Sequence, residues 1–231
     1  MKTTGIILAG GSGRRMGTDV KKQYMLLKDK PVLYYSLKAF SDSFIDEIII
    51  VAGEEDIEYV KSKIVAKYGF TKVTKVISGG KERYHSVLNG INAADKCDYI
   101  FIHDGARPMV TTQILERGLE AVKEYDACVI GMPSKDTVKI ADENGMVAST
   151  PNRNLVWNIQ TPQIFRYELI KEAYNDVVGR EEELKAKGVV ITDDAMILEE
   201  YSGHPVKLVE GSYENIKITT MSDIDFVMNL L

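Results

Sequence analysis

The sequence has few cysteines and few histidines. It contains two cysteines, Cys97 and Cys128, and three scattered histidines in 231 residues. Two cysteines exclude a disulfide framework, so we expect reduced thiols in a cytoplasmic protein. No apolar run approaches the roughly 20 residues of a membrane span. The first predicted strand follows residues 1–4 too closely for a signal peptide, so we expect none.

The sequence also lacks an excess of positive charge. Its formal net charge is −5, with a charged fraction of 27%. An acidic chain argues against general binding to nucleic acid or to a membrane surface, so we expect neither as a partner and expect the cations to act locally. Apolar residues make up 45% of the chain, enough for a full core. We predict a single domain over residues 1–231.

Apolar β-branched segments alternate with amphipathic segments in the first half of the chain. This alternation predicts an α/β fold with a doubly wound, mostly parallel sheet whose ligands bind at the carboxyl ends of the strands. The predicted strands are Thr4–Ala9, Glu47–Val51, Val73–Ile77, Tyr99–His103 and Ala127–Gly131, and the predicted helices are Val32–Phe40, Ile57–Tyr68, Ser86–Ala94 and Thr112–Lys123.

The pattern changes after Pro133. Asn144-Gly145 is a strong tight-turn signal between two short apolar stretches, so we predict a protruding β-hairpin arm at about residues 137–152. An isolated hairpin is marginally stable, so we expect it to pack on another surface, such as a second subunit. Further predicted elements are helices at Arg166–Tyr174, Arg180–Lys187, Ala195–Tyr201 and Ser222–Leu231, the last capped by Ser222, and strands at Val206–Val209 and Asn215–Thr219.

A glycine-rich stretch, residues 9–17, follows the first predicted strand. Its glycines let backbone N–H groups approach a ligand closely. Arg14, Arg15 and Lys22 repel one another unless an anion is present, so the stretch predicts a phosphate-binding site rather than an ordinary turn. Met16 stands where a dinucleotide-binding fingerprint needs a third small residue, and a Walker loop needs a different spacing. A dehydrogenase is therefore disfavoured.

Four later segments allow a structural interpretation, a functional one, or both. Asp104 and Arg107 follow the fourth strand and can form a simple ion pair, or Asp104 can face a Mg²⁺-bound triphosphate. Ser86 can cap a helix after a second glycine turn, or help to read a nucleobase. Residues 191–195 can be a capped helix start. Lys217, late in the chain, can close over a phosphate.

Taken together, six motifs in order over nearly the whole chain resemble the 2-C-methyl-D-erythritol 4-phosphate cytidylyltransferase family. They are Leu8-Ala9-Gly10-Gly11 with Arg15-Met16 and Lys22-Gln23, Gly80-Lys81-Glu82-Arg83 with Ser86, His103-Asp104-Gly105-Ala106-Arg107-Pro108, Gln160-Thr161-Pro162-Gln163, Ile191-Thr192-Asp193, and Glu210-Gly211 with Asn215-Ile216-Lys217-Ile218-Thr219. The resemblance implies a glycosyltransferase-A-like, Rossmann-like domain, a homodimer joined by the arm, and a Mg²⁺-dependent enzyme acting on CTP and a polyol phosphate.

The resemblance also implies residue roles. Arg15, Lys22, Lys217 and Asp104 are expected to be catalytic, with Asp104 beside the metal. Expected CTP-binding residues are Ala9, Gly10, Gly11, Gly13, Gly80, Arg83 and Ser86. Expected residues for the second substrate are Arg107, Thr137, Arg153, Thr161 and Thr192, of which Arg153 and Thr192 reach from the other subunit. Lys81 departs from the family, which often has aspartate there.

Two other functions remain open from the sequence. Ribitol-5-phosphate cytidylyltransferase has the same chemistry with another acceptor, and residues 155–157 favour the methylerythritol enzyme over it. A regulatory protein that binds a nucleotide without turning it over is the alternative of another class. The presence of Arg15, Lys22, Asp104 and Lys217 argues against that alternative.

Overall fold

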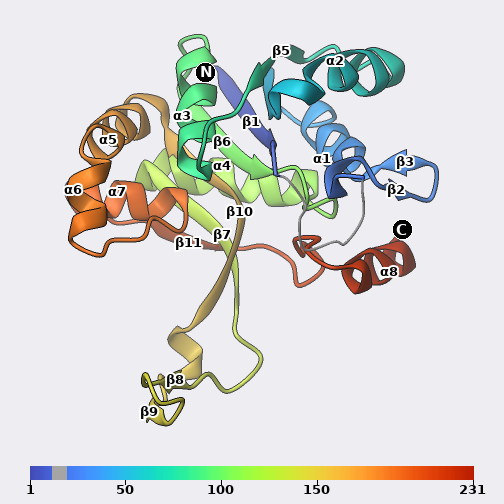
Figure 1. The fold of residues 1–231 in the computed structure, drawn as a ribbon. Coiled ribbons are helices and arrows are strands. Elements are labelled where there is room, and N and C mark those ends of the chain that lie inside the picture. Colours follow the sequence, from blue (N-terminus) through green and yellow to red (C-terminus); the bar gives the residue numbers. More distant parts are fainter. Residues whose placement is uncertain (12–19) are drawn as a thin grey trace.

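The fold centres on strand β1 (Thr3–Ala9) in a seven-stranded sheet of order β11-β7-β10-β6-β1-β4-β5. The computed structural model describes residues 1–11 and 20–231. β1 lies between β4 (Glu47–Ala52) and β6 (Tyr99–Asp104) and runs parallel to both, and β5 (Val73–Ser78) continues the parallel part beyond β4 (Figure 1). The first four of the five strands predicted in the first half of the chain therefore form as expected, within one residue at each end.

Helices cover both faces of the sheet, so the predicted doubly wound arrangement is confirmed. Alternate residues of β1 are buried in different cores. On one face of the sheet, Ile7 packs with α1 (Val32–Ser41) and α4 (Thr112–Tyr125). On the other face, Ile6 packs with α3 (Arg83–Ala93), α5 (Tyr167–Gly179) and α7 (Asp194–Ser202). Side chains alternate across a strand, which is why a strand buried on both faces is continuously apolar.

One strand of the seven-stranded sheet was not predicted. β10 (Trp157–Arg166) lies antiparallel between β6 and β7 (Ala127–Pro133), and β11 (Lys207–Glu210) pairs with the outer side of β7. The pairing of β10 with β7 shifts register between Ile159 and Gln163. Pro162, within that irregular stretch, has no N–H to donate to a neighbouring strand.

The predicted arm is present. Its strands β8 (Ile140–Ala141) and β9 (Val147–Ser149) lie within the predicted range, and η5 (Arg153–Leu155) follows them (Figure 1). The carboxylate of Asp142 accepts hydrogen bonds from two turn amides, and Gly145 has a φ of 77°, which favours glycine. The arm extends away from the body, and most of its residues are exposed.

Three details differ from the sequence predictions. The predicted helix Ile57–Tyr68 is divided into α2 (Ile57–Tyr59) and the π-helix η4 (Val60–Ala66), after a 3-10 turn η3 (Glu54–Asp56). Helix α8 (Met221–Leu230) is capped by Thr220 rather than Ser222, because Asp223 supplies the reciprocal half of a capping box. Residues 215–219 do not form a strand.

The remaining elements are short. They are η2 (Lys22–Tyr24), β2 (Leu26–Leu27), β3 (Lys30–Pro31) and α6 (Glu181–Ala186). Ile218 packs with Leu27, Val32 and α8 in a small third core, which holds the C-terminal segment against the beginning of the chain. In the part of the chain that the structure describes, no helix has the length and apolar character to cross a membrane.

Candidate active site

A cavity of about 490 Å³ opens at the carboxyl ends of β1, β4 and β6. This is the edge of the sheet at which parallel α/β proteins bind ligands. Nine of the sequence-predicted residues line it: Ala9, Gly10, Gly11, Lys22, Gly80, Arg83, Ser86, Asp104 and Lys217. Gly13 and Arg15 lie outside the described residues. The structure therefore brings the two glycine segments and the late lysine to one hollow.

A glutamine holds the described part of the first glycine segment. The side-chain amide of Gln23 donates to the carbonyl oxygens of Ala9 at 2.6 Å and Gly11 at 3.0 Å. Gln23 is 3% exposed. Sequence reasoning quoted Gln23 as part of a motif but gave it no role. The structure shows that it fixes the backbone at the end of β1.

The C-terminal segment forms the opposite wall of the cavity. Lys22 Nζ donates to the carbonyl oxygen of Ile218 at 2.9 Å, and the neighbouring Lys217 Nζ lies 2.7 Å from Asp104 Oδ2. Ile218 N–H in turn donates to the Ala106 carbonyl at 2.9 Å. Two lysines that are far apart in the sequence thereby line one cavity, and Lys217 lies beside the carboxylate that ends β6.

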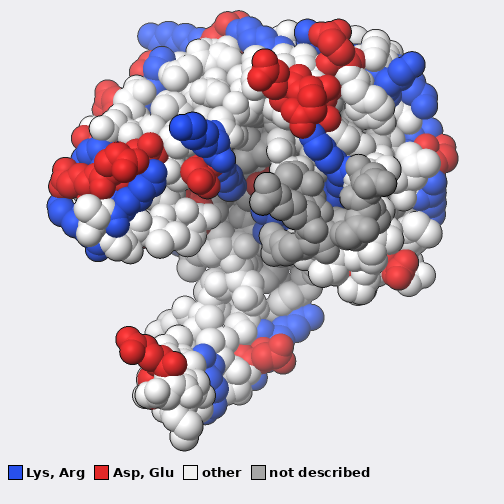
Figure 2. Space-filling view, in the orientation of Figure 1, with Lys and Arg blue, Asp and Glu red and all other residues white. Residues whose placement is uncertain are grey.

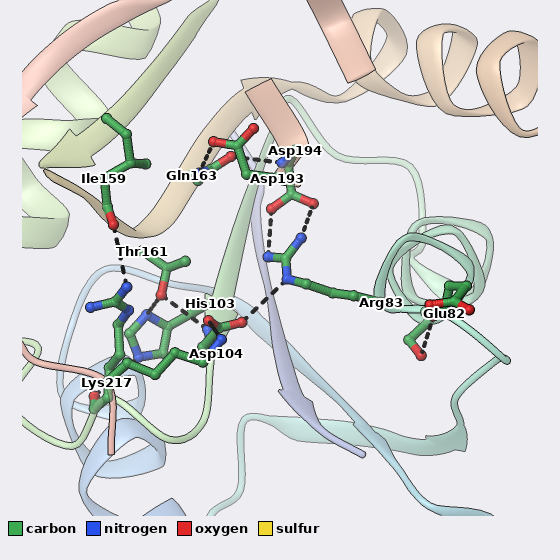
Figure 3. Close-up of polar contacts among 12 residues, drawn as sticks. Glu82, Arg83, His103, Asp104, Ile159, Thr161, Gln163, Asp193, Asp194 and Lys217 are labelled. Atoms are coloured by element: carbon green, nitrogen blue, oxygen red, sulfur yellow. Dashed lines mark hydrogen bonds and ion pairs between the residues drawn. The ribbon is translucent and has the colours of Figure 1, made fainter. Parts of the chain in front are cut away.

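The charge on Asp104 is set by its cationic neighbours. Burial alone would raise the pKa of this carboxyl group, but Arg83 and Lys217 outweigh burial and hold the pKa well below its ordinary value. Arg83 Nε lies 3.5 Å from Asp104 Oδ1, on the other side of the carboxylate from Lys217 (Figure 3). Asp104 is therefore an oriented anion at the floor of the cavity.

Arg83 has a second and closer carboxylate partner that sequence reasoning missed. Its two terminal nitrogens donate to the two oxygens of Asp194 at 2.7 and 2.8 Å (Figure 3). Asp194 is fully buried. Burial alone would lower the pKa of the Arg83 guanidinium. The effect of Asp194 is opposite and larger, so the pKa lies well above its ordinary value. No local pattern marks this pair, because its members are 111 positions apart.

The second glycine turn is tied to the start of α3. Gly80 N–H donates to Ser86 Oγ at 3.0 Å, and Ser86 Oγ donates to the Glu82 carbonyl at 3.2 Å. A Cβ atom at Gly80 would lie 2.4 Å from His85 Cβ, so only glycine fits there. The cap of α3 is Glu82, in a capping box with His85. The interpretation of Ser86 as a helix cap is therefore wrong.

Arg107 and Thr161 do not line the cavity. Thr161, 4% exposed, accepts a hydrogen bond from Asp104 N–H, and its hydroxyl lies 3.0 Å from His103 Nδ1. Arg107 donates to the carbonyls of Asn215 at 2.8 Å and Ile159 at 3.4 Å. The simple ion pair between Asp104 and Arg107 is not formed; among the described residues, Asp104 instead pairs with Lys217 and Arg83.

His103 is buried and neutral beneath the site. Burial lowers its pKa to about 4. His103 Nε2 lies 3.3 Å from the Arg107 carbonyl oxygen, which can only accept, so the neutral ring carries its proton on Nε2. His103 Nδ1 is then an acceptor and receives the hydroxyl proton of Thr161, whose oxygen accepts from Asp104 N–H. These hydrogen bonds fix the backbone on both sides of Asp104.

The remaining predicted residues are exposed and lie away from the cavity lining. Thr137 and Arg153 belong to the arm, where Arg153 donates to the Lys135 carbonyl at 3.3 Å. Thr192 precedes α7, and its hydroxyl contacts the Met196 sulfur at 3.7 Å. Asp193 caps α7 by accepting from Met196 N–H at 3.1 Å, so the helix-start interpretation of residues 191–195 is confirmed. Roles in substrate binding stay predictions for all three.

The donor set suits a cation carried by phosphates rather than a protein-built metal cage. In residues 1–11 and 20–231, no group of three or more His, Cys, Asp or Glu side chains is arranged to hold a metal ion. Asp104 supplies one carboxylate at the cavity floor. Magnesium is commonly held by one or two carboxylates together with substrate phosphates, so this arrangement fits Mg²⁺.

Comparison with known proteins identifies the family and the fold of the chain. A sequence model of the family described as 2-C-methyl-D-erythritol 4-phosphate cytidylyltransferase matches residues 3–230. The chain belongs to this family. A relative of that name from Lachnoclostridium phytofermentans is 51% identical and covers 100% of this chain and 96% of its own length. Another, from Lachnospira eligens, is 48% identical over 96% of both chains.

Solved structures agree with this assignment. The 4-diphosphocytidyl-2C-methyl-D-erythritol synthase of Anaerococcus prevotii has a TM-score of 0.81 at 34% identity, over 99% of this chain and 97% of its own. The Francisella tularensis 2-C-methyl-D-erythritol 4-phosphate cytidylyltransferase has a TM-score of 0.78 at 30% identity over the full length of both. The activity of the family, cytidylyl transfer from CTP to 2-C-methyl-D-erythritol 4-phosphate for non-mevalonate isoprenoid synthesis, is the function of this chain.

Proposed function

We propose that the cavity at the end of β1 is where this chain transfers a cytidylyl group from CTP to 2-C-methyl-D-erythritol 4-phosphate. The products are 4-diphosphocytidyl-2-C-methyl-D-erythritol and pyrophosphate. The observation that carries the proposal is the meeting of Lys22 and Lys217 with Asp104 in one hollow. Figure 2 shows mixed charges over the drawn face of the body, so these local cations, rather than a general basic surface, account for anion binding.

The reaction needs charge stabilisation more than it needs a base. A phosphate oxygen of the acceptor is already anionic, so it attacks the α-phosphorus of CTP in line and expels pyrophosphate without prior deprotonation. The difficulty is to bring two anions together and to stabilise charge on a five-coordinate phosphorus. Lys22 and Arg15 act on the α-phosphate and leaving group, and Lys217 orients the attacking phosphate beside Asp104.

The nucleotide is assigned to the two glycine segments. We assign the backbone N–H groups of Ala9, Gly10 and Gly11 to the triphosphate oxygens, and the family resemblance adds Gly13 to this set. Gly80, Arg83 and Ser86 line the other side of the cavity and bind the cytosine and ribose end. The restriction of residue 80 to glycine leaves its backbone accessible to a ligand.

Magnesium is part of the proposal. When bound to the CTP phosphates beside Asp104, Mg²⁺ neutralises charge on the triphosphate and helps to orient it. Asp104 remains ionised for this role because Arg83 and Lys217 outweigh the effect of burial and keep its pKa low. Removal of divalent cations with EDTA is expected to abolish turnover and leave the far-ultraviolet circular dichroism spectrum unchanged. Turnover that persists in EDTA would contradict this part of the proposal.

A homodimer joined by the arm supplies the rest of the acceptor site. Four apolar side chains on or beside the hairpin are at least half exposed: Ile140 at 50%, Met146 at 67%, Val147 at 61% and Leu155 at 80%. Such exposure is typical of an interaction surface. Arg107, Thr137 and Thr161 serve the acceptor within a subunit, and Arg153 and Thr192 approach the partner's site. Sedimentation of a monomer at assay concentration would contradict this arrangement.

We assign the enzyme to the cytoplasm as part of the same proposal. Both cysteines, Cys97 and Cys128, are buried free thiols. Burial raises the pKa of the Cys128 thiol to about 12, which keeps it protonated and unreactive. Thiols of this kind suit a reducing compartment. No nucleic acid or membrane partner is proposed.

Pyrophosphate release from CTP tests the proposed function. With 2-C-methyl-D-erythritol 4-phosphate as acceptor, release is expected to depend on both substrates, and ribitol 5-phosphate is expected to support little. Preference for ribitol 5-phosphate would instead make the chain a ribitol-5-phosphate cytidylyltransferase. Binding of CTP without pyrophosphate release with either acceptor would favour a regulatory protein.

A further inference from the structure

A buried ion pair forms part of the cavity wall between α3 and α7. Both terminal nitrogens of Arg83 donate to Asp194 at 2.7 and 2.8 Å, in the forked geometry that guanidinium and carboxylate groups favour (Figure 3). Arg83 lines the cavity with 29% of its side chain exposed, whereas Asp194 is 0% exposed. The pair therefore joins a cation at the site to an anion in the interior.

Asp194 is itself held from two other directions. The hydroxyl of Tyr174, which is fully buried on α5, donates to Asp194 Oδ1. The Asp194 N–H donates to Gln163 Oε1 at 2.9 Å. The Asp194 side chain is not the cap of α7, because Asp193 performs that role. Helix capping therefore does not explain the Asp194 carboxylate.

Arg83 connects Asp194 to the reacting end of the cavity. Its Nε lies 3.5 Å from Asp104 Oδ1, and the Lys217 Nζ lies 2.7 Å from Asp104 Oδ2. Four charges thus alternate in sign from the interior to the cavity: Asp194, Arg83, Asp104 and Lys217. A buried ion pair contributes little net stability after desolvation, so its value here lies in placing charges.

We infer that Asp194 is a positioning residue for the reaction, which holds the Arg83 fork away from Asp104. Without this carboxylate, the fork turns to Asp104 as the nearest remaining anion and competes with Lys217 for it. Lys217 then loses its fixed place at the reacting end. The inference rests on the proposed function of the cavity.

The variant Asp194→Asn keeps the size of the side chain and a hydrogen-bond acceptor for Tyr174, and it removes the charge. We expect kcat/KM for CTP to fall about tenfold or more, the size typical of coupled charged neighbours. Arg83→Lys keeps the positive charge and removes the fork. In the Arg83→Lys background, the further change Asp194→Asn is expected to alter kcat/KM less than about twofold. The guanidinium fork that Asp194 holds is already absent from that background.

A purely structural role for Asp194 predicts a different result. The same fold-loss from Asp194→Asn in the wild-type and Arg83→Lys backgrounds would overturn the inference. Tyr174→Phe is the matched control, since it removes one buried hydrogen bond to the same carboxylate and leaves the ion pair. We expect it to lower the midpoint of urea unfolding while kcat/KM stays within about twofold of wild type.

A second variant covers the case in which Asp194→Asn does not fold. Asp194→Glu keeps the charge and moves the carboxylate by one methylene group, so it disturbs the fork without leaving Arg83 unpaired. A folded Asp194→Glu protein with wild-type kcat/KM would overturn the inference. Failure of the wild-type protein to turn over CTP with either acceptor would instead refute the proposed function, so the two failures are distinguishable.

Discussion

Lys22 Nζ donates a 2.9 Å hydrogen bond to the carbonyl oxygen of Ile218, which joins segments 196 positions apart. Ile218 follows Lys217, whose ammonium group lies 2.7 Å from Asp104. The end of the chain is therefore a wall of the active site rather than an appendage. Correct placement of Lys217 depends on the same contacts that fix Lys22.

Replacement of Lys22 by alanine is expected to remove most of the turnover. Loss of one electrostatic contact to the transition state costs on the order of 3 kcal/mol, so kcat is expected to fall roughly a hundredfold. Folding should remain intact, because the charged hydrogen bond to Ile218 contributes only about 1.5–3 kcal/mol, less than the roughly 5–15 kcal/mol that stabilises a typical domain. Steady-state pyrophosphate release measures kcat. Lys123→Ala, an exposed lysine on α4, is the control, and an unchanged kcat in Lys22→Ala would remove Lys22 from the mechanism.

Replacement of Lys217 by alanine is expected to weaken use of the acceptor more than binding of CTP. Lys217 is assigned to the attacking phosphate, so kcat/KM for 2-C-methyl-D-erythritol 4-phosphate is expected to fall about a hundredfold. The dissociation constant of CTP, measured by calorimetry without acceptor, should change less than about threefold. Lys217→Arg keeps the charge and should recover part of the loss. An equal loss in both quantities would assign Lys217 to the nucleotide instead.

Replacement of Thr161 by valine tests whether this hydroxyl positions Asp104. Valine keeps the shape but leaves Asp104 N–H and His103 Nδ1 without their partner. Loss of the buried hydrogen bonds is expected to lower the free energy of unfolding by about 1–3 kcal/mol in urea titrations. Thr161→Ser retains the hydroxyl and should restore most of the stability. If the valine variant were as stable as wild type, the hydroxyl would not support Asp104.

Stability is expected to fall between pH 6.5 and pH 4 because of His103. Burial lowers the pKa of His103 to about 4 in the folded protein, whereas the unfolded chain titrates near its ordinary value of about 6.5. The unfolded state therefore binds the proton first as the pH falls, and unfolding becomes more favourable.

The change from pH 7 to pH 5 should be about 2 kcal/mol in the free energy of unfolding. Urea titrations at the two pH values measure it. The variant His103→Gln cannot titrate, so its stability should fall much less over the same interval, whatever its stability at pH 7. Asp104 affects stability over a lower pH range. Its pKa is lowered in the folded protein, so the ionised carboxylate stabilises the fold above about pH 4, and this stability is lost only on further acidification. Equal pH dependence in wild type and His103→Gln would contradict the assignment.

The sequence predicted those parts of the fold that depend on local patterns. The β1 residues Ile6 and Ile7 are apolar because both faces of the strand are buried, and that pattern is visible without the rest of the chain. β10 was missed because Gln160, Thr161 and Pro162 interrupt its apolar pattern. Gln160 is buried by hydrogen-bonding Ser212, 52 positions away, which a local pattern does not show.

The candidate site was predictable where residue type alone indicates chemistry. Glycines that let the backbone approach a ligand and lysines that supply positive charge together predict a phosphate site. Nine of the predicted residues line the cavity. Asp194 appeared in the sequence only as one member of a helix-start signal, because its partner Arg83 comes from another helix. Residues 215–219 alternate like a strand, but Ile218 instead packs in the small core with Leu27 and α8.

A crystal structure of the complex with CTP tests the central claim most directly. The account predicts a triphosphate at the carboxyl end of β1, with its oxygens within hydrogen-bonding distance of Lys22 and the α-phosphate facing Lys217 and Asp104. A well-ordered CTP bound elsewhere, with Lys22 and Lys217 not in contact with any phosphate, would contradict it.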